Sequence, residues 1–103
     1  MAKRMNRAEF EAAIKADSPV IIEFYSDSCV PCKRLSPLLA EIEEANPDLI
    51  IGKVNAAYEA DLAAELSVTS TPTLLFYRSG IQAGRISGAV RKAQLEEAIA
   101  EYR

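Results

Sequence analysis

The chain has 103 residues, of which 50% are hydrophobic and 26% are charged, and its formal net charge is −3. This length and composition are typical of a soluble globular protein, so we expect a single domain over residues 1–103. The slight acidity argues against binding to nucleic acid, which usually requires a basic surface. No apolar run reaches the roughly 18 residues that a membrane span needs, and no apolar segment of a secretory signal follows the N-terminus. These features favour a cytoplasmic protein that does not bind a membrane.

The first half of the chain alternates helical and extended patterns. Asn6 and Glu9 are spaced as a capping box, which predicts the start of a helix that ends near residues 18–19. Residues 20–25 (VIIEFY) are almost continuously apolar, which predicts a strand buried on both faces. Leucine and isoleucine at helical spacing then predict a second helix over about residues 30–46.

The second half contains two more helices and three more strands. Residues 49–55 predict a strand, and residues 58–68 a short helix whose apolar face begins with its first residue, a tyrosine. Residues 73–78 and 81–87 are joined by a Ser-Gly turn, which is typical of an antiparallel hairpin. An apolar stripe predicts a last helix over residues 92–102.

The order of these elements predicts the fold class. Alternating helices and strands favour a parallel βαβ unit, and the hairpin adds antiparallel strands to the same sheet. A short further strand at residues 2–5 fits the pattern. We therefore expect an α/β protein built as a three-layer α/β/α sandwich, with a mixed sheet of four to five strands flanked by four helices.

Both cysteines, Cys29 and Cys32, form one C-x-x-C pair where the strand at 20–25 leads into the second helix. A structural zinc site needs about four cysteine or histidine ligands, and because the chain has no histidine, two copies would have to share a metal ion or cluster. A purely structural disulfide would close a very short loop and would stabilise the fold little. The third alternative, a redox-active pair, agrees best with the local pattern.

The expected position of Cys29 at a helix N-terminus favours its thiolate. Unpaired backbone N–H groups and the helix dipole stabilise a negative charge there, and Pro31 is well suited to the first helical turn. At helical spacing the Cβ atoms of the pair lie about 5–6 Å apart, so a slight tightening of the turn allows a disulfide. Because Cys32 lies one turn further in, we expect Cys29 to attack a target and Cys32 to resolve the intermediate.

Several segments together resemble the thioredoxin family. They are the C-x-x-C pair after a strand of a βαβ unit, the TPTLLFY segment about 40 residues later, and glycines at 80 and 88. The resemblance extends over nearly the whole chain. It implies a thioredoxin-like fold and a protein dithiol–disulfide oxidoreductase that acts as a monomer without a bound cofactor. It also implies disulfide-containing target proteins and a separate reductase of the thioredoxin-reductase type as partners.

The resemblance further implies a docking groove for the target beside the thiols. Pro72 matches the cis-proline of the family, and a cis bond would turn the backbone of Thr71 toward the thiols, where an extended target segment could pair with it. The substrate-binding residues expected in this way are Ser28, Val30, Pro31, Thr71, Pro72, Gly88 and Ala89.

Glu23 and Lys53 are the other two expected catalytic residues, besides the cysteines. Glu23 is an acid inside an apolar strand, and burial should raise its pKa. The family usually has an aspartate at this position, which exchanges protons with the resolving cysteine, and a lysine that matches Lys53 close to it. Two simpler alternatives are that Glu23 is only paired with Lys53, and that Lys53 is a surface residue at a strand edge.

Departures from the family pattern leave open whether the cysteine pair reduces or oxidises its targets. Ser28 stands where the family commonly has tryptophan, and Val30 where glycine is common. Asp27, close to Cys29, opposes thiolate formation. The reduction potential therefore does not follow from the resemblance. The alternatives are an oxidant or isomerase, a glutaredoxin-like protein that uses glutathione, and a binding module whose thiols are idle.

Overall fold

The computed structural model describes residues 2–103. Its elements in chain order are β1 (Lys3–Arg4), α1 (Arg7–Ile14), β2 (Val20–Tyr25), α2 (Val30–Ala45), β3 (Ile50–Asn55), α3 (Ala60–Glu65), β4 (Thr73–Arg78), β5 (Ile81–Ser87) and α4 (Lys92–Tyr102). The strands form one five-stranded sheet in the order β1-β3-β2-β4-β5. β1, β3 and β2 run parallel to one another, whereas β4 and β5 are antiparallel to their neighbours.

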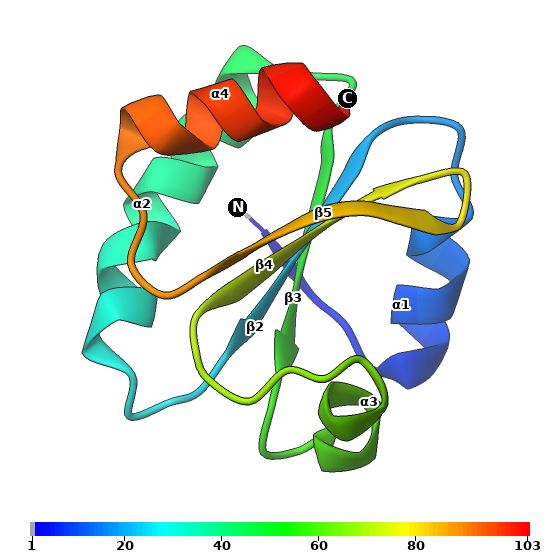
Figure 1. Ribbon diagram of the computed structural model, residues 1–103, viewed down its shortest axis with the longest axis vertical. Coiled ribbons are helices and arrows are strands. Elements are labelled where there is room, and N and C mark those ends of the chain that lie inside the picture. Colours follow the sequence, from blue (N-terminus) through cyan, green and yellow to red (C-terminus); the bar gives the residue numbers. More distant parts are fainter. Residues whose placement is uncertain (1) are drawn as a thin grey trace.

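Helices cover both faces of this mixed sheet, with α2 and α4 on one face and α1 and α3 on the other (Figure 1). The predicted three-layer α/β/α sandwich is therefore confirmed, and the sheet has the larger of the two expected strand numbers. Within residues 2–103, no helix has the length and apolar character required to cross a bilayer.

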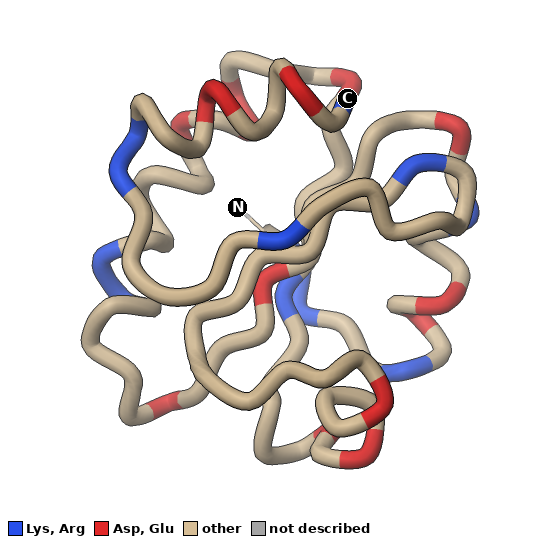
Figure 2. Tube along the Cα trace, in the orientation of Figure 1, with Lys and Arg blue, Asp and Glu red and all other residues tan. Residues whose placement is uncertain are grey.

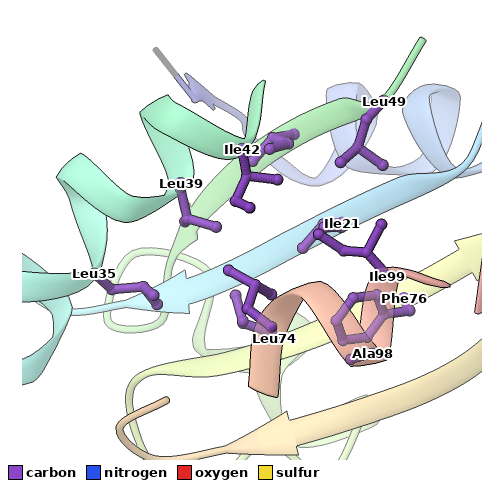
Figure 3. Packing of buried hydrophobic residues seen from close by; sticks show 11 residues of the cluster. Ile21, Leu35, Leu39, Ile42, Leu49, Leu74, Phe76, Ala98 and Ile99 are labelled. Atoms are coloured by element: carbon purple, nitrogen blue, oxygen red, sulfur yellow. The ribbon is translucent and has the colours of Figure 1, made fainter. Parts of the chain in front are cut away.

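The core consists of two apolar clusters, one on each face of the sheet. Along β2, alternate residues enter different clusters, because successive side chains of a strand point to opposite faces. Figure 3 shows the cluster under α2 and α4. Its buried members are Ile21, Leu35, Leu39, Ile42, Leu49, Ile51, Leu74, Phe76, Leu95, Ala98 and Ile99. The central strand is thus held from both sides, and the loop that follows it starts from a rigid base.

The predicted capping box at the start of α1 is confirmed. The side chain of Asn6 accepts a hydrogen bond from the Glu9 backbone N–H at 2.9 Å, and Glu9 Oε1 accepts one from the Asn6 N–H at 3.1 Å. These two bonds satisfy N–H groups that have no partner within the helix. α1 then packs Phe10 into the cluster on its face of the sheet.

The third helix is shorter than the sequence pattern predicts, and the assignment of Tyr58 to its apolar face is wrong. α3 covers only Ala60–Glu65, and Tyr58 is 82% exposed in the turn before it. The reason is Asn55, whose side-chain oxygen accepts hydrogen bonds from the backbone N–H groups of Ala57 and Tyr58 at 2.9 and 3.2 Å. This local turn competes with helix formation and delays the first helical residue.

Candidate active site

Cys29 and Cys32 lie at the point where β2 leads into the 16-residue helix α2. Cys29 is the N-cap residue, and Pro31 occupies the first turn, where its missing N–H has no cost. The two sulfur atoms are joined in a disulfide, with the Cα atoms 5.2 Å apart. Cys32 is only 4% exposed, whereas Cys29 is half-buried, so Cys29 is the more accessible of the two.

The N-cap position gives the sulfur of Cys29 a hydrogen-bond donor. The backbone N–H of Cys32 lies 3.1 Å from Cys29 Sγ, in the geometry of a side chain that caps a helix. A thiolate at this place would accept that hydrogen bond and would face the positive end of the α2 dipole. The local backbone therefore favours the ionised form of Cys29 in the reduced protein.

Two further loops meet the cysteine loop, which we define as residues 26–32 and which includes the first turn of α2, at this end of the sheet. The Thr71–Pro72 peptide bond is cis, and Thr71 Oγ1 lies 3.4 Å from Ser26 Oγ. Gly88, at a positive φ of 86° that favours glycine, donates its N–H to the Pro72 carbonyl at 2.8 Å. The two contacts connect segments 26–32, 71–72 and 88–89, which are far apart in the sequence.

The expected groove residues lie on these three loops but differ in exposure. Val30 is 56% exposed, and Ser28, Pro31 and Ala89 are also exposed. Thr71 and Gly88 are half-buried, and Pro72 is buried. An open hollow of about 400 Å³ lies beside Thr71 and extends to α3. The rim is therefore made of small and medium-sized side chains, and residues 2–103 contain no tryptophan that could flank the thiols.

Glu23 lies in the middle of β2 and is only 1% exposed. Neither of its carboxylate oxygens has a hydrogen-bond partner among the described residues. Burial raises the pKa of Glu23 from its ordinary 4.5 to about 7, and the positive charge of Lys53 opposes this rise. The carboxyl group can therefore gain or lose a proton near neutral pH, a property it would lack on the surface.

Lys53 is opposite Glu23 in the register of β2 and β3, but it is not the strand-edge residue that one alternative assumed. β3 is an inner strand, since β1 pairs with its far side. The Lys53 side chain is half-buried, and its Nζ lies 4.4 Å from the centre of the Tyr25 ring, within cation–π distance. Lys53 thus acts on Glu23 through its charge, without a hydrogen bond to it.

Two pockets lie between the sheet and α2 near these residues. One, of about 290 Å³, is lined by Glu23 together with Pro37 and Ala40 of α2. The other, of about 150 Å³, is lined by Cys32 together with Tyr25 and Asp27. The side chains that line both pockets are Ser36 and Lys53. Ser36 is not among the site residues predicted from the sequence, although its position four residues after Cys32 places the two on one face of the helix.

These groups are suited to thiol–disulfide exchange. They combine an accessible sulfur at a helix N-terminus, a buried second sulfur, and a buried carboxyl group behind them. Within residues 2–103, no three cysteine, aspartate or glutamate side chains gather where they could hold a metal ion. The arrangement can stabilise a thiolate at Cys29, form a disulfide across one helical turn and exchange a proton with the buried carboxyl group.

The comparison with known families decides the identity. The family model described as thioredoxin matches residues 1–101. The chain belongs to the thioredoxin family. A thioredoxin from Alicyclobacillus acidocaldarius is 32% identical over 95 residues, which cover 91% of this chain and 90% of that protein. Thioredoxin-1 from Saccharomyces cerevisiae is 32% identical over 93 residues, which cover 90% of this chain and 89% of the yeast protein.

Solved structures of thioredoxins agree with this assignment. Oxidised mitochondrial thioredoxin 3 from Saccharomyces cerevisiae aligns with a TM-score of 0.87 at 33% identity, over 96% of this chain and 93% of that one. A thioredoxin from Plasmodium falciparum aligns with a TM-score of 0.90 at 27% identity, over 99% and 100% of the two chains. The thioredoxin-like fold of this chain is thereby shown.

Membership of the family, with a C-x-x-C pair at disulfide distance, makes this chain a dithiol–disulfide oxidoreductase. Thioredoxins act on disulfides of target proteins and are recycled by a thioredoxin reductase. Of the alternatives left open by the sequence, the purely structural disulfide is thus set aside.

Proposed function

We propose that this thioredoxin reduces disulfides in partner proteins, with Cys29 as the nucleophile and Cys32 as the resolving thiol. The Cys29 thiolate attacks one sulfur of the target disulfide, so a mixed disulfide forms and the other target sulfur leaves as a thiolate. The Cys32 thiolate then attacks Cys29 Sγ and displaces the second target thiolate. Two electrons pass to the target, and the Cys29–Cys32 pair becomes the disulfide.

The observation that carries this proposal is the helix-capping position of Cys29. Its Sγ lies 3.1 Å from the Cys32 backbone N–H, and its side chain is more accessible than the buried Cys32. A sulfur with a backbone donor and the α2 dipole beside it has a greater thiolate fraction near neutral pH than an ordinary cysteine. Exposed Asp27 nearby acts in the opposite direction, but water screens it.

Glu23 takes up the proton of Cys32 in this proposal. Cys32 must lose its proton before it attacks the mixed disulfide, and an acceptor with a pKa near the working pH is the most effective. Glu23 is buried, lacks a hydrogen-bond partner among residues 2–103 and has a pKa of about 7. Lys53 limits the rise of that pKa and so keeps part of the carboxyl ionised at neutral pH.

The target docks, on the same proposal, as an extended segment against the backbone of Thr71, next to cis-Pro72. Gly88 and Ala89 border one side of the thiols, and the cysteine loop with its exposed Val30 borders the other. Thiol–disulfide exchange needs no bound cofactor. We further propose that the chain acts as a monomer in the cytoplasm, although some relatives, such as thioredoxin-3 from yeast, are mitochondrial.

Alkylation of the reduced protein by iodoacetamide tests the nucleophile. We expect Cys29 at pH 7 to react at least about tenfold faster than a cysteine in an unfolded peptide, because its thiolate fraction is larger. The Cys32→Ser variant should keep this rate and should accumulate a mixed disulfide with insulin, whereas Cys29→Ser should do neither. A peptide-like rate at Cys29 would overturn the proposal.

The direction of transfer needs a separate measurement. Equilibration with glutathione buffers gives the reduction potential of the Cys29–Cys32 pair. A potential near that of known reducing thioredoxins, about −270 mV, supports reduction of targets. A value close to −120 mV, typical of a strong oxidant, would contradict it.

A further inference from the structure

Ser36 lies on α2 one turn beyond the resolving cysteine. Cys32 and Ser36 are four residues apart, so their side chains share one face of the helix. The Ser36 side chain is half-buried, and its hydroxyl donates a hydrogen bond to the Cys32 carbonyl at 3.4 Å. This bond is long, so little energy is lost when the hydroxyl turns to another partner.

Ser36 lines both pockets under α2. The larger pocket is also lined by Glu23, whose carboxylate oxygens have no hydrogen-bond partner among the described residues, and the smaller one is also lined by Cys32. Only two of their lining residues, Ser36 and Lys53, belong to both. A proton that moves from Cys32 to Glu23 through this space therefore passes one or both of these side chains.

Ser36 and Lys53 differ in whether the side chain can accept a proton. A protonated lysine has three donors and no acceptor, so it cannot accept a proton from a thiol. A serine hydroxyl has one donor and two acceptor sites, and it can accept a proton on one side while it donates on the other. Moreover, the ammonium group of Lys53 lies over the Tyr25 ring. Ser36 is therefore the side chain shared by the pockets that can transmit a proton.

We propose that Ser36 takes part in release of the target by passing the proton of Cys32 toward Glu23. The thiol proton moves onto Ser36 Oγ as the hydroxyl proton moves on to the Glu23 carboxylate, directly or through solvent in the larger pocket. The balance is that Cys32 becomes a thiolate, Glu23 becomes a neutral acid and Ser36 is unchanged. This inference rests on the proposed role of Glu23.

Basic and acidic residues are interspersed along the chain (Figure 2), and those that line the two pockets influence this transfer. Lys53 of β3 lines both pockets, and Arg4 of β1, Lys33 of α2 and Asp27 of the cysteine loop line the smaller one. The positive charge of Lys53 favours ionised Glu23. The cations that line the smaller pocket favour ionised Cys32, and the negative charge of Asp27 opposes it.

The test compares Ser36→Ala with Ser36→Thr, of which only the second keeps a hydroxyl. Single-turnover reduction of a disulfide-bonded peptide by the reduced protein gives the rate of target release as a function of pH. We expect Ser36→Ala to release the peptide about tenfold more slowly near pH 7, a modest part of what general acid–base catalysis contributes. Ser36→Thr should remain within about twofold of the parent, since its hydroxyl can serve the same purpose.

Stability separates this proposal from a structural role of Ser36. Alanine has a higher helix propensity than serine or threonine, so Ser36→Ala should be the most stable of the three proteins. A structural role would make activity follow stability, whereas we expect the most stable variant to be the slowest. If Ser36→Thr is as slow as Ser36→Ala, or if Ser36→Ala is as fast as the parent, the proposal is overturned.

A double mutant distinguishes failure of this inference from failure of the proposed function. If Ser36 acts through Glu23, then Ser36→Ala should slow release by less than about twofold in a Glu23→Gln background, where no carboxylate remains. If Glu23→Gln slows release and Ser36→Ala does not, Glu23 keeps its proposed role and the inference about Ser36 fails. If Glu23→Gln itself leaves the pH profile unchanged, both fail.

Discussion

The two faces of the sheet each bury one polar group that lacks a hydrogen-bond partner. Among residues 2–103, the atoms concerned are the two carboxylate oxygens of Glu23, on the α2 face, and the hydroxyl oxygen of Tyr77, on the α1 face. The two side chains are similarly hidden, with 1% and 4% exposure. Their surroundings differ, however, and so does what each can do.

Burial brings the pKa of one of these groups into the physiological range and moves the pKa of the other further above it. The pKa of Glu23 rises to about 7, where a proton can be gained or lost. Burial also raises the pKa of Tyr77, but from 10, so that its hydroxyl stays neutral. Glu23 lines a pocket of about 290 Å³, whereas Tyr77 packs at right angles to the ring of Phe10, 5.7 Å away. A buried polar group thus becomes chemically useful only with a suitable pKa and an open path for protons.

The largest effect in this comparison is expected from Phe10→Ala, on the α1 face. Phe10 is 3% exposed and contacts the rings of Phe24 and Tyr77. Its truncation should reduce the free energy of unfolding by about 3–5 kcal/mol in urea denaturation of the oxidised protein. The alkylation rate of Cys29 in the folded, reduced variant should not change, since the site lies at the end of the sheet and on its other face. A parallel loss of Cys29 reactivity would show that the two faces are not independent.

The next largest effect concerns the pH dependence of stability, which Glu23→Gln should alter. The folded protein keeps a proton on Glu23 that the unfolded chain has released above pH 4.5, so stability falls as the pH rises from 4.5 through about 7. A shift from 4.5 to about 7 corresponds to a loss of about 3 kcal/mol by pH 8. Urea titrations of the oxidised protein at several pH values should show this loss in the parent and not in the variant.

The paired surface acids do not interfere with that measurement. Arg103 lowers the pKa of Asp48, and Arg7 lowers that of Glu65, mainly through side-chain hydrogen bonds. Both carboxyl groups therefore contribute stability that is lost only as the pH falls below their ordinary pKa range. This change has the opposite sign to the one caused by Glu23, and it occurs at lower pH. If the parent and the Glu23→Gln variant have parallel stability curves above pH 5, Glu23 does not titrate as described.

The smallest effect is expected from Tyr77→Phe, which removes the partnerless hydroxyl from the α1 face. Because that hydroxyl has no hydrogen-bond partner among the described residues, its removal should leave the free energy of unfolding unchanged or raise it by up to about 1 kcal/mol. Neither the pH dependence of stability nor the rate of target release should change. A destabilisation of more than 1 kcal/mol would reveal a hydrogen bond of Tyr77, and a slower release would contradict the separation of the two faces.

The sequence predicted the features that depend on local patterns. The apolar run over residues 20–25 indicated a strand buried on both faces, with Glu23 inside it, and the structure buries every residue of that strand. The capping box of Asn6 and Glu9 needs only residues three apart, and the position of Cys29 at a helix entry follows from the strand and helix on either side. Such features involve one element or a single junction, so a period or a spacing is enough to reveal them.

Features that need three elements at once could not be predicted in this way. Ser36 lines both pockets because α2 lies over β2 and β3 at a particular rotation, which no spacing in the sequence specifies. Likewise, the inner position of β3 depends on the two-residue strand β1, and it overturns the strand-edge interpretation of Lys53. The exposed Tyr58 fits a helical pattern, but the side chain of Asn55 imposes a turn there instead.

The central place of β2 in the sheet has a consequence for how the molecule opens. β3 and β4 hydrogen-bond to it on both sides, so its amides should be among the last to exchange with deuterium, in the unit that opens only on global unfolding. The cysteine loop continues directly from this strand, and the side chains of Ser28, Val30 and Ala89 are exposed around the thiols. If targets dock as proposed, substitutions on that rim would change which proteins the chain recognises, while the cysteines stay attached to the strand that we expect to exchange most slowly.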